Sequence, residues 1–465
     1  MGLAKIFEEY SAKFAGSRAL YERARKLIPS GVNHDARFII PFPLYMDHAQ
    51  GCRKWDVEGH EFFDLCTGHG SLILGHGHPA VLKAVNEAVG KFTHPSAPTP
   101  YEVRWAELIT SIVPCAEMVR FQLSGTEATM LAIRIARAHT GRDLVVKVRG
   151  HFHGWHDYAM IQYLAPYEIP SSAGVPKALA GSIRGVPLHD LAAMEAALAP
   201  RDVAAVILEA DGPAGGAVPT RPGYLQGLRE LTRKYGTILI FDEVITGFRM
   251  APGGAQEYYG VTPDMATYAK AVCGGVPGSA VAGKAEIMGN LTFRPDDPDF
   301  NRKKRVRHQG TFSANPITAA AGVAALELLK DGSVQDQAAK AADRLRAGFN
   351  NALREAGAAG CLYGVRSSTR LLVGDDLPNI YDPVEFAAAV DDERLLVNVK
   401  QPLHSALQCA QLLEGIDILV CTHGWTSAAM TEADTKDAVA RWERALHRVI
   451  AEGYLSGKGK VFASA

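Results

Sequence analysis

Cysteine is sparse in this 465-residue sequence and is not arranged for a structural role. The seven cysteines are odd in number and form no CxxC pair, which argues against a disulfide framework and against a zinc knuckle. No apolar run approaches the length that crosses a membrane. The first sixteen residues read as an amphipathic helix of mixed charge and lack the apolar core of a secretory signal. These absences together predict a cytoplasmic protein.

Neither sign of charge is in excess, because 49 lysines and arginines stand against 50 acidic residues and give a net charge of -1. This balance provides no bulk attraction to nucleic acid or to an anionic membrane. One basic run, residues 302–307, is typical of a solvated loop. The sequence contains neither a Walker pattern nor a GxGxxG pattern, which disfavours a site for nucleotide phosphates. We therefore expect small molecules as partners.

Short apolar runs alternate with helix-period segments from about residue 60 to residue 330. Buried strands are predicted at Val145–Val148, Ala204–Leu208 and Thr237–Phe241, and amphipathic helices at Ala128–Ala138 and Tyr224–Lys234. Alternation of this kind predicts an α/β domain with a mostly parallel sheet that is covered on both faces.

The pattern changes near residue 335, where an Ala- and Arg-rich helical segment begins. We interpret residues 61–335 as a large domain and residues 336–465 as a small domain, which residues 1–60 join. The stretch from Tyr158 to Leu188 is rich in Pro, Gly and Ser and has no clear period. A connection of that length is typical of a lid or a binding loop.

The segment GHFHGWHDY, residues 150–158, places three histidines and an aspartate within seven positions. One interpretation is a metal centre, and with it a metal-dependent hydrolase, built on His151, His153 and His156. The other interpretation is an aromatic side chain that polar groups and glycines frame. Two further histidine motifs carry less weight: GHGHP at 75–79 reads as a structural turn, and His60-Glu61 lacks the second histidine of HExxH.

Three features elsewhere bear on this choice. Ser124-Gly125-Thr126 stands directly before a strong helical pattern, so its hydroxyls and free N–H groups suit a phosphate, although an ordinary helix cap reads the same way. Asp242 ends an apolar strand, at the edge where α/β proteins bind ligands; a helix cap is again the alternative. Lys270 precedes two Gly-rich turns and can form a Schiff base if burial keeps its amine neutral, whereas most lysines lie on the surface.

In this order, a phosphate cradle, an acid at a strand end and a lysine among glycines are what pyridoxal phosphate requires. The same segments resemble class III aminotransferases of fold type I: SGTEA at 124–128, FDEV…GFR at 241–249 and AK…GGxP at 269–277. GHGHP at 75–79 and HQGTFSANPIT at 308–318 extend the resemblance over nearly the whole chain. Residues 31–37 and 172–176 are similar to the glutamate-1-semialdehyde aminomutase branch. EVRWAE at 102–107 and GHFHGWHD at 150–157 resemble D-phenylglycine aminotransferase.

The resemblance implies a large domain with a mostly parallel seven-stranded sheet, and a smaller α+β domain built from both chain ends. It also implies roles for individual residues. Lys270 carries the cofactor and catalyses the reaction, Asp242 holds the pyridine nitrogen, and Phe152 and Val244 pack on the two faces of the ring. The remaining residues implied to bind the cofactor are Ser124, Gly125, Thr126, His153, Glu209 and Thr311, the last of these across a homodimer interface.

Two positions near the expected site depart from the family pattern. Phe152 stands where the family more often has tyrosine, which keeps a stacking surface without a hydroxyl. Ala210-Asp211 follows Glu209 where Glu-Pro is usual. For substrate binding, Arg37 aligns with an arginine that holds a carboxylate, a task that suits its bidentate fork; Arg366 and Arg370 are rival candidates. Trp155, with Phe38, Phe42 and Tyr45, could line an aromatic pocket, although such residues are more often core.

We therefore expect a cytoplasmic, homodimeric, pyridoxal-phosphate-dependent aminotransferase without a metal. It would move an amino group from an amino acid or amine, including aromatic, D- or β-amino acids, to a 2-oxo acid by a ping-pong mechanism. The alternatives on the same fold are a glutamate-1-semialdehyde-type aminomutase and a lyase, racemase or decarboxylase. A cofactor-binding protein without catalysis is a further alternative, against which the pair Lys270 and Asp242 argues.

Overall fold

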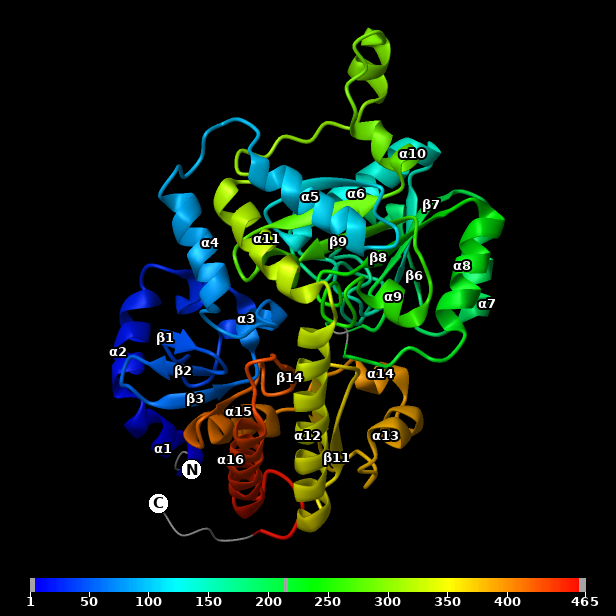
Figure 1. Ribbon diagram of the computed structural model, residues 1–465. Coiled ribbons are helices and arrows are strands. Elements are labelled where there is room, and N and C mark those ends of the chain that lie inside the picture. Colours follow the sequence, from blue (N-terminus) through cyan, green and yellow to red (C-terminus); the bar gives the residue numbers. More distant parts are fainter. Residues whose placement is uncertain (1–4, 213, 215, 460–465) are drawn as a thin grey trace. The chain divides into compact units, whose positions relative to one another are not determined.

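The computed structural model describes residues 5–212, 214 and 216–459 and divides the chain into two compact units. One unit is continuous and runs from Pro79 to Ser333. The other combines both chain ends, Met1–His78 and Val334–Ala465. The colours of Figure 1 show this composition directly, because blue and orange-red elements occur together in the second unit. Among the described residues, no helix combines the length and the apolar character that crossing a membrane requires.

The unit Pro79–Ser333 contains a seven-stranded sheet with the strand order β4-β10-β9-β8-β7-β5-β6. Only β10 runs antiparallel to its neighbours, so the sheet is mostly parallel, as predicted. In chain order the strands are β4 (Met118–Gln122), β5 (Leu144–Val148), β6 (Ile183–Val186), β7 (Val203–Leu208), β8 (Ile238–Asp242), β9 (Met265–Ala269) and β10 (Ser279–Gly283). The three strands predicted from apolar runs are β5, β7 and β8.

The predicted loop between Tyr158 and Leu188 is wrong in its last part. Residues 177–182 form a 3-10 helix, and Ile183–Val186 form the edge strand β6, which pairs in parallel with β5. The sequence IRGV of this strand has one glycine, one charged residue and no alternation over only four positions. This segment therefore forms a strand because it pairs with β5, and not because of its own residue pattern.

Every residue of β7, β8 and β9 is buried, as expected for central parallel strands covered on both faces. Helix α6 (Gly125–Thr140) packs against β7, β8, β9 and β10, and its buried side chains join those of the strands in one apolar cluster. The other helices of this unit are α4 (Pro79–Val89), α5 (Pro100–Ile112), α7 (Leu191–Leu198), α8 (Tyr224–Tyr235), α9 (Ala255–Tyr259), α10 (Ala285–Met288) and α11 (Pro316–Leu329).

The unit of both chain ends holds two small sheets, with the orders β1-β2-β3-β13 and β11-β12-β14. The first sheet joins the two ends of the chain, because β13 (Ile416–Asp417) pairs in parallel with β3 (Glu61–Asp64). The remaining strands are β1 (Met46–Gln50), β2 (Arg53–Asp56), β11 (Gly360–Tyr363), β12 (Ser368–Val373) and β14 (His423–Trp425). The helices are α1 (Lys5–Lys13), α2 (Ala15–Ala24), α3 (Thr67–Gly70), α12 (Ser333–Ala356), α13 (Pro383–Ala389), α14 (Asp392–Leu395), α15 (Leu403–Leu413) and α16 (Glu432–Ala451).

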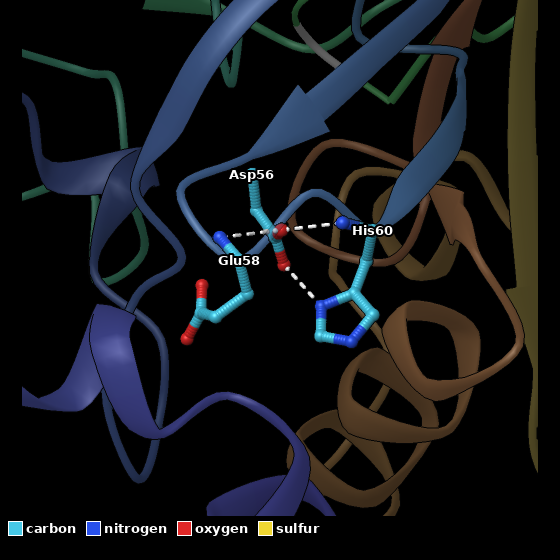
Figure 2. Close-up of side chains that lie close together, drawn as sticks. All are labelled: Asp56, Glu58 and His60. Carbon is cyan, nitrogen blue, oxygen red and sulfur yellow. Dashed lines mark hydrogen bonds and ion pairs between the residues drawn. The ribbon is translucent and has the colours of Figure 1, made fainter.

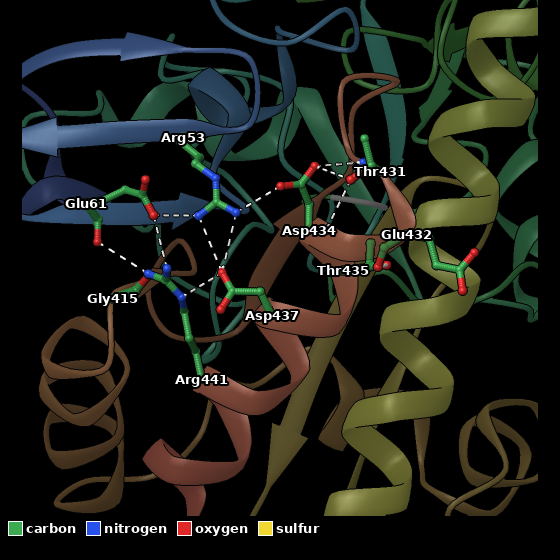
Figure 3. Close-up of polar contacts among 9 residues, drawn as sticks. All are labelled: Arg53, Glu61, Gly415, Thr431, Glu432, Asp434, Thr435, Asp437 and Arg441. Carbon is green, nitrogen blue, oxygen red and sulfur yellow. Dashed lines mark hydrogen bonds and ion pairs between the residues drawn. The ribbon is translucent and has the colours of Figure 1, made fainter. Parts of the chain in front are cut away.

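A network of charged side chains ties the N-terminal strands to the C-terminal helix (Figure 3). Arg53 on β2 donates to Glu61 on β3 at 2.5 Å and to Asp434 on α16 at 2.9 Å. Arg441 on α16 returns to the same Glu61 at 3.0 Å and also pairs with Asp437 at 3.0 Å. Every acid in the network accepts at least one of these hydrogen bonds. Ordering one side chain therefore lowers the entropic cost of ordering the next.

We expect the substitution Arg53→Met to lower the free energy of unfolding of this unit by about 1–2 kcal/mol. It removes the central donor of a partly buried network and leaves Glu61 and Asp434 without it. Urea unfolding monitored by circular dichroism measures the loss. The matched control is Arg25→Met, because among the described residues the Arg25 side chain has one partner, Glu22, in an exposed pair at 2.7 Å. Equal losses in the two variants would show that the network stabilises the unit no more than an exposed ion pair does.

Candidate active site

Asp242, the last residue of β8, is buried and held by three donors. Its Oδ2 lies 2.7 Å from Nδ1 of His153. Its Oδ1 accepts a hydrogen bond from the backbone N–H of Val244 at 3.1 Å and from the Thr267 hydroxyl on β9 at 3.2 Å. A buried carboxylate needs such donors to offset the loss of hydration. The arrangement holds a negative charge in one orientation at the carboxyl edge of the sheet.

His153 lies in the loop after β5 and presents Nδ1 to this carboxylate, while its Nε2 is buried without a hydrogen-bond partner among the described residues. Burial lowers the pKa of His153, and the hydrogen bond to Asp242 opposes this effect. The neutral ring therefore donates from Nδ1–H. Sequence comparison with the family placed His153 at the cofactor, and the structure places it beside Asp242.

Helix α6 begins at the predicted phosphate cradle. Ser124 is the N-cap, and its hydroxyl accepts from the Glu127 N–H at 3.3 Å, while the Glu127 carboxylate accepts from the Ser124 N–H at 3.0 Å. This capping box leaves the N–H groups of Gly125 and Thr126 without an acceptor in the described part of the chain. Free N–H groups at the positive end of a sixteen-residue helix form an anion site.

Two glycines bring this helix start against the residues of the expected ring site. Gly154 has φ +95°, and a Cβ there would lie 2.5 Å from the Thr126 hydroxyl oxygen and 2.7 Å from Thr126 Cα. A Cβ on Gly125 would lie 3.0 Å from a methyl group of Val244. The loop after β5, the start of α6 and the turn after β8 therefore meet at close range, and side chains at these two positions would separate them.

Glu209 follows β7 directly and organises the loop that carries Phe152. Its carboxylate accepts from the Phe152 N–H at 2.9 Å and from the Ala214 N–H at 2.8 Å. Burial raises the pKa of Glu209 to about 8, and the nearby Asp242 charge adds to this shift. The Phe152 ring is 36% exposed and lies against Tyr163 with ring centroids 5.2 Å apart. The Phe152 side chain is thus packed against one aromatic neighbour and partly exposed.

Lys270 follows β9 immediately and begins a short 3-10 turn with φ +55°. A left-handed conformation is costly for a residue with a Cβ and tends to occur at functional sites. Burial lowers the pKa of Lys270, the charges of Asp242 and Glu209 oppose this effect, and Arg249 adds to it. A larger fraction of neutral amine favours attack on a carbonyl group.

The departure at Ala210-Asp211 has a structural account. Asp211 is buried, and its Oδ1 accepts from the Tyr259 hydroxyl at 2.7 Å and from the Thr220 N–H at 3.4 Å. Burial raises the pKa of Asp211 to about 7. The hydrogen bond from Tyr259 of α9 thus fixes the turn after Glu209, at the position next to the usual proline.

The histidines of the loop after β5 serve the loop itself. His151 Nδ1 accepts from the Glu209 N–H at 3.0 Å, and His156 Nε2 lies 3.2 Å from the Thr129 hydroxyl on α6. Burial lowers the pKa of both rings. In the part of the chain that the structure describes, neither these two histidines nor His153 belong to a group of three potential metal ligands.

Two groups elsewhere do bring three such ligands together, and their atoms have other partners. In the first (Figure 2), Asp56 Oδ1 accepts from the N–H groups of Glu58 and His60 at 3.0 and 2.7 Å, and Oδ2 lies 2.9 Å from His60 Nδ1. Glu58 in turn accepts from the Ser17 N–H at 2.8 Å. These bonds close the turn between β2 and β3.

The second group is Asp64, Cys66 and Asp417. The ammonium of Lys54 lies 3.0 Å from Asp64 and 2.5 Å from Asp417, and His76 from the GHGHP motif reaches Asp64 at 2.6 Å. The lysine therefore supplies the positive charge that these acids require, and the motif has the structural role predicted for it.

The two substrate residues predicted from the sequence, Arg37 and Trp155, belong to different units. Arg37 is exposed in the unit of both chain ends, whereas Trp155 lies in the other unit, 76% exposed, with its N–H 3.4 Å from the Thr126 hydroxyl. Thr311 is exposed before α11. Phe42 is buried beside Tyr10, with ring centroids 5.1 Å apart, so the expected aromatic pocket loses this member to the core.

The rival arginines are both engaged within their own unit. Arg370 on β12 is buried and donates to the Thr422 hydroxyl at 3.1 Å and to Asn398 at 2.6 Å. Arg366 pairs with Asp336 on α12 at 2.6 Å. Sequence reasoning missed Thr267 and Gly154. A threonine three residues before the expected lysine and a glycine directly after the Phe-His pair were the available signals.

Comparison with known proteins supports the fold and the chemistry. Residues 36–368 match the model of the family "Aminotransferase class-III". The chain belongs to this family. A glutamate-1-semialdehyde 2,1-aminomutase of Methanothrix thermoacetophila is 42% identical over 368 residues, which cover 78% of this chain and 83% of the relative.

Two solved structures are similar over almost their whole length. An omega-transaminase from Sphaerobacter thermophilus has a TM-score of 0.83 and 33% identity and covers 93% of this chain and 97% of its own. A transaminase with pyridoxal phosphate bound has a TM-score of 0.82 and 30% identity, with coverages of 95% and 99%. This class III aminotransferase is a pyridoxal-phosphate-dependent enzyme of fold type I.

The residues at the carboxyl edge of the sheet fit this cofactor. The free N–H groups of Gly125 and Thr126 suit its phosphate, and the fixed carboxylate of Asp242 suits a protonated pyridine nitrogen. The two glycines keep the space between these groups free of a Cβ. Lys270 supplies an amine with a lowered pKa in the same unit.

We expect Gly154→Ala to weaken binding of pyridoxal phosphate by about tenfold or more, because the new Cβ would collide with Thr126 and push the loop from the helix start. Titration of the apoprotein with cofactor, followed by visible absorption, measures the change. Gly174→Ala is the matched control, since Gly174 also has a positive φ, +89°, but open space around its Cβ position. If both variants bind equally well, the contact with Thr126 does not shape the site.

Proposed function

We propose that this enzyme transfers an amino group from an amino acid or amine to a 2-oxo acid by a ping-pong reaction. The observation that carries the proposal is Lys270, strained and with a lowered pKa, beside the fixed pair of Asp242 and His153. Pyridoxal phosphate, when bound, supplies an electron sink that stabilises negative charge on the substrate carbon.

Each residue of the site has a defined task in this proposal. Ser124, Gly125 and Thr126 hold the phosphate, and Asp242 keeps a proton on the pyridine nitrogen. His153 fixes the orientation of Asp242, as its 2.7 Å contact indicates. Lys270 Nζ would act as the general base that removes the proton from the substrate carbon. Its lowered pKa favours the free-base form that this step needs.

Phe152 and Val244 are proposed to enclose the ring between them. Val244 is positioned by its own N–H bond to Asp242, and its side chain lies where a Cβ on Gly125 would meet it. Phe152 is positioned by Glu209 through its N–H. Both side chains are thus connected to groups that also bind the cofactor, so ring and phosphate positions depend on each other.

An apolar substrate is favoured by the loop after β5. Large apolar side chains on this loop are unusually exposed: Trp155 at 76%, Leu164 at 53% and Ile169 at 57%. Exposed apolar groups next to a site suit an apolar or aromatic amino donor. Arg37 is our candidate for the substrate carboxylate, because its exposed side chain has no hydrogen-bond or ion-pair partner among the described residues.

The second candidate is an aminomutase, which moves the amino group within one molecule. The relative that is 42% identical bears the name of such an enzyme, and the same buried lysine and acid would serve either outcome. A lyase, racemase or decarboxylase would also use them. The bond that is held perpendicular to the ring decides among these outcomes, and substrate contacts set it.

The proposal includes a homodimer with shared active sites. Thr311 is exposed, and within the described residues no hydrogen bond connects it to the start of α6. An exposed threonine suits a role at the phosphate of a partner's site. Cytoplasmic location and small-molecule partners belong to the same proposal.

We expect Lys270→Ala to lower turnover by at least about a thousandfold and to remove the visible band that the lysine-bound cofactor gives. Steady-state rates and absorption spectra measure both effects. Lys83→Ala, on the exposed face of α4, should behave as the unchanged protein. Substantial turnover by Lys270→Ala would refute the assignment of the catalytic lysine.

Transfer and mutation are distinguished by following the amino group itself. We expect single amino donors to bleach the visible band, and a ¹⁵N-labelled donor to deliver its label to a separately added 2-oxo acid. Aromatic and aliphatic donors should be compared with glutamate-1-semialdehyde as the control for the second candidate. If the label stays within the carbon skeleton of its donor, the enzyme is an aminomutase and not a transferase.

A further inference from the structure

Lys147 is a buried lysine that the proposed reaction does not use. It lies on β5 between Val146 and Val148 and is 1% exposed. Within the described residues no carboxylate lies within ion-pair distance of its ammonium, and its one hydrogen bond goes to the backbone oxygen of Ala159 at 2.8 Å. A buried amine with one acceptor is costly, and an apolar side chain would cost less at this position. A functional reason is therefore required.

The bond to Ala159 closes the loop that carries two proposed cofactor residues. This loop leaves β5 at Arg149, passes Phe152 and His153 and turns at Ala159, whose N–H donates to the His156 oxygen at 2.8 Å. Its other attachments include the bond from the Phe152 N–H to Glu209, the contact of His153 with Asp242 and the bond from the Thr129 hydroxyl to the His153 backbone oxygen at 2.6 Å. Lys147 supplies the attachment at the far end.

The charge of Lys147 acts on the same site. Glu209 and Asp242 raise the pKa of Lys147, while burial, the larger effect, lowers it to about 7. Lys147 in turn lowers the pKa values of His151, His153 and His156. Lys270 responds to the same two acids and to Arg249. The titratable groups that interact with the Lys147 amine therefore come from the ends of β7 and β8 and from the loop after β5.

We propose that Lys147 is a positioning residue of the active site, an inference that rests on the proposed function. Its ammonium holds the loop 149–161 through Ala159 and supplies a buried positive charge that balances Glu209 and Asp242. It contacts neither substrate nor cofactor in this role. The loop therefore presents Phe152 and His153 in a fixed position beside these two acids.

Two variants separate the tether from the charge. Lys147→Met removes both, whereas Lys147→Gln keeps an N–H donor and removes the charge. Lys83→Met, the same chemical change on the exposed surface of α4, is the control. The first readout is hydrogen exchange of the apoprotein, in peptides that cover residues 149–161. We expect faster exchange there in Lys147→Met, and exchange close to that of the unchanged protein in Lys147→Gln. Equal exchange in all proteins would overturn the tether.

The second readout is the pH dependence of the visible band of bound cofactor between about pH 5 and 9. A nearby positive charge favours the deprotonated form of its neighbours, so its removal should move the midpoint to higher pH by about one pH unit in both variants. A purely structural lysine would leave the midpoint unchanged. A midpoint equal to that of Lys83→Met would overturn the charge role, and Lys147→Gln decides this alone if Lys147→Met does not fold.

The two proposals fail in distinguishable ways. If the unchanged protein shows no visible band with pyridoxal phosphate, the proposed function is wrong, and hydrogen exchange still tests the tether. If the unchanged protein shows the band and the variants keep its midpoint, the proposed function stands and the charge role of Lys147 does not.

Discussion

The buried hydrogen bond between His153 and Asp242 is the constraint on which the site depends. It joins the loop after β5 to the end of β8 at 2.7 Å. The carboxylate is also fixed from β9 by Thr267 and from its own turn by Val244. Leaving any of these donors unpaired in the interior would cost free energy. The strands therefore hold the loop, and the loop fixes the orientation of the acid.

Lys270 and Glu209 lie at the same edge of the sheet, and burial shifts the pKa of each. Burial lowers the pKa of Lys270 and raises that of Glu209, so both groups shift toward their neutral forms. Asp242 accepts three hydrogen bonds, which offset the loss of hydration of its carboxylate. Glu209 and Asp242 thus lie at the ends of neighbouring strands and are held by different hydrogen-bond donors.

The unit of both chain ends depends on charged contacts rather than on a large sheet. Its main sheet has four short strands, and one of them, β13, is two residues long. Ion pairs from Arg53 and Arg441 to Glu61 join the N-terminal strands to α16. The group of Lys54, Asp64 and Asp417, in which Asp64 is buried, joins β2, β3 and β13. Segments more than 350 residues apart in sequence are thereby held in one unit.

Much of the larger unit could be predicted from the sequence because its signals are local. Apolar runs mark β5, β7 and β8, since central parallel strands are buried on both faces. Ser124, Asp242 and Lys270 follow or precede such runs directly, and their chemistry in that order indicates the cofactor. The edge strand β6 was mistaken for loop because its four residues carry no pattern and it forms only by pairing with β5.

Tertiary structure alone decided which of these residues meet. The sequence offered three histidines with equal claims to a metal, and packing assigned His153 to Asp242, His151 to the Glu209 backbone and His156 to Thr129. Lys147 looked like one residue of a strand until its burial and its bond to Ala159 were visible. Residue types and strand ends are properties of neighbouring positions along the chain. Hydrogen-bond partners and burial depend on contacts between distant segments, which only folding brings together.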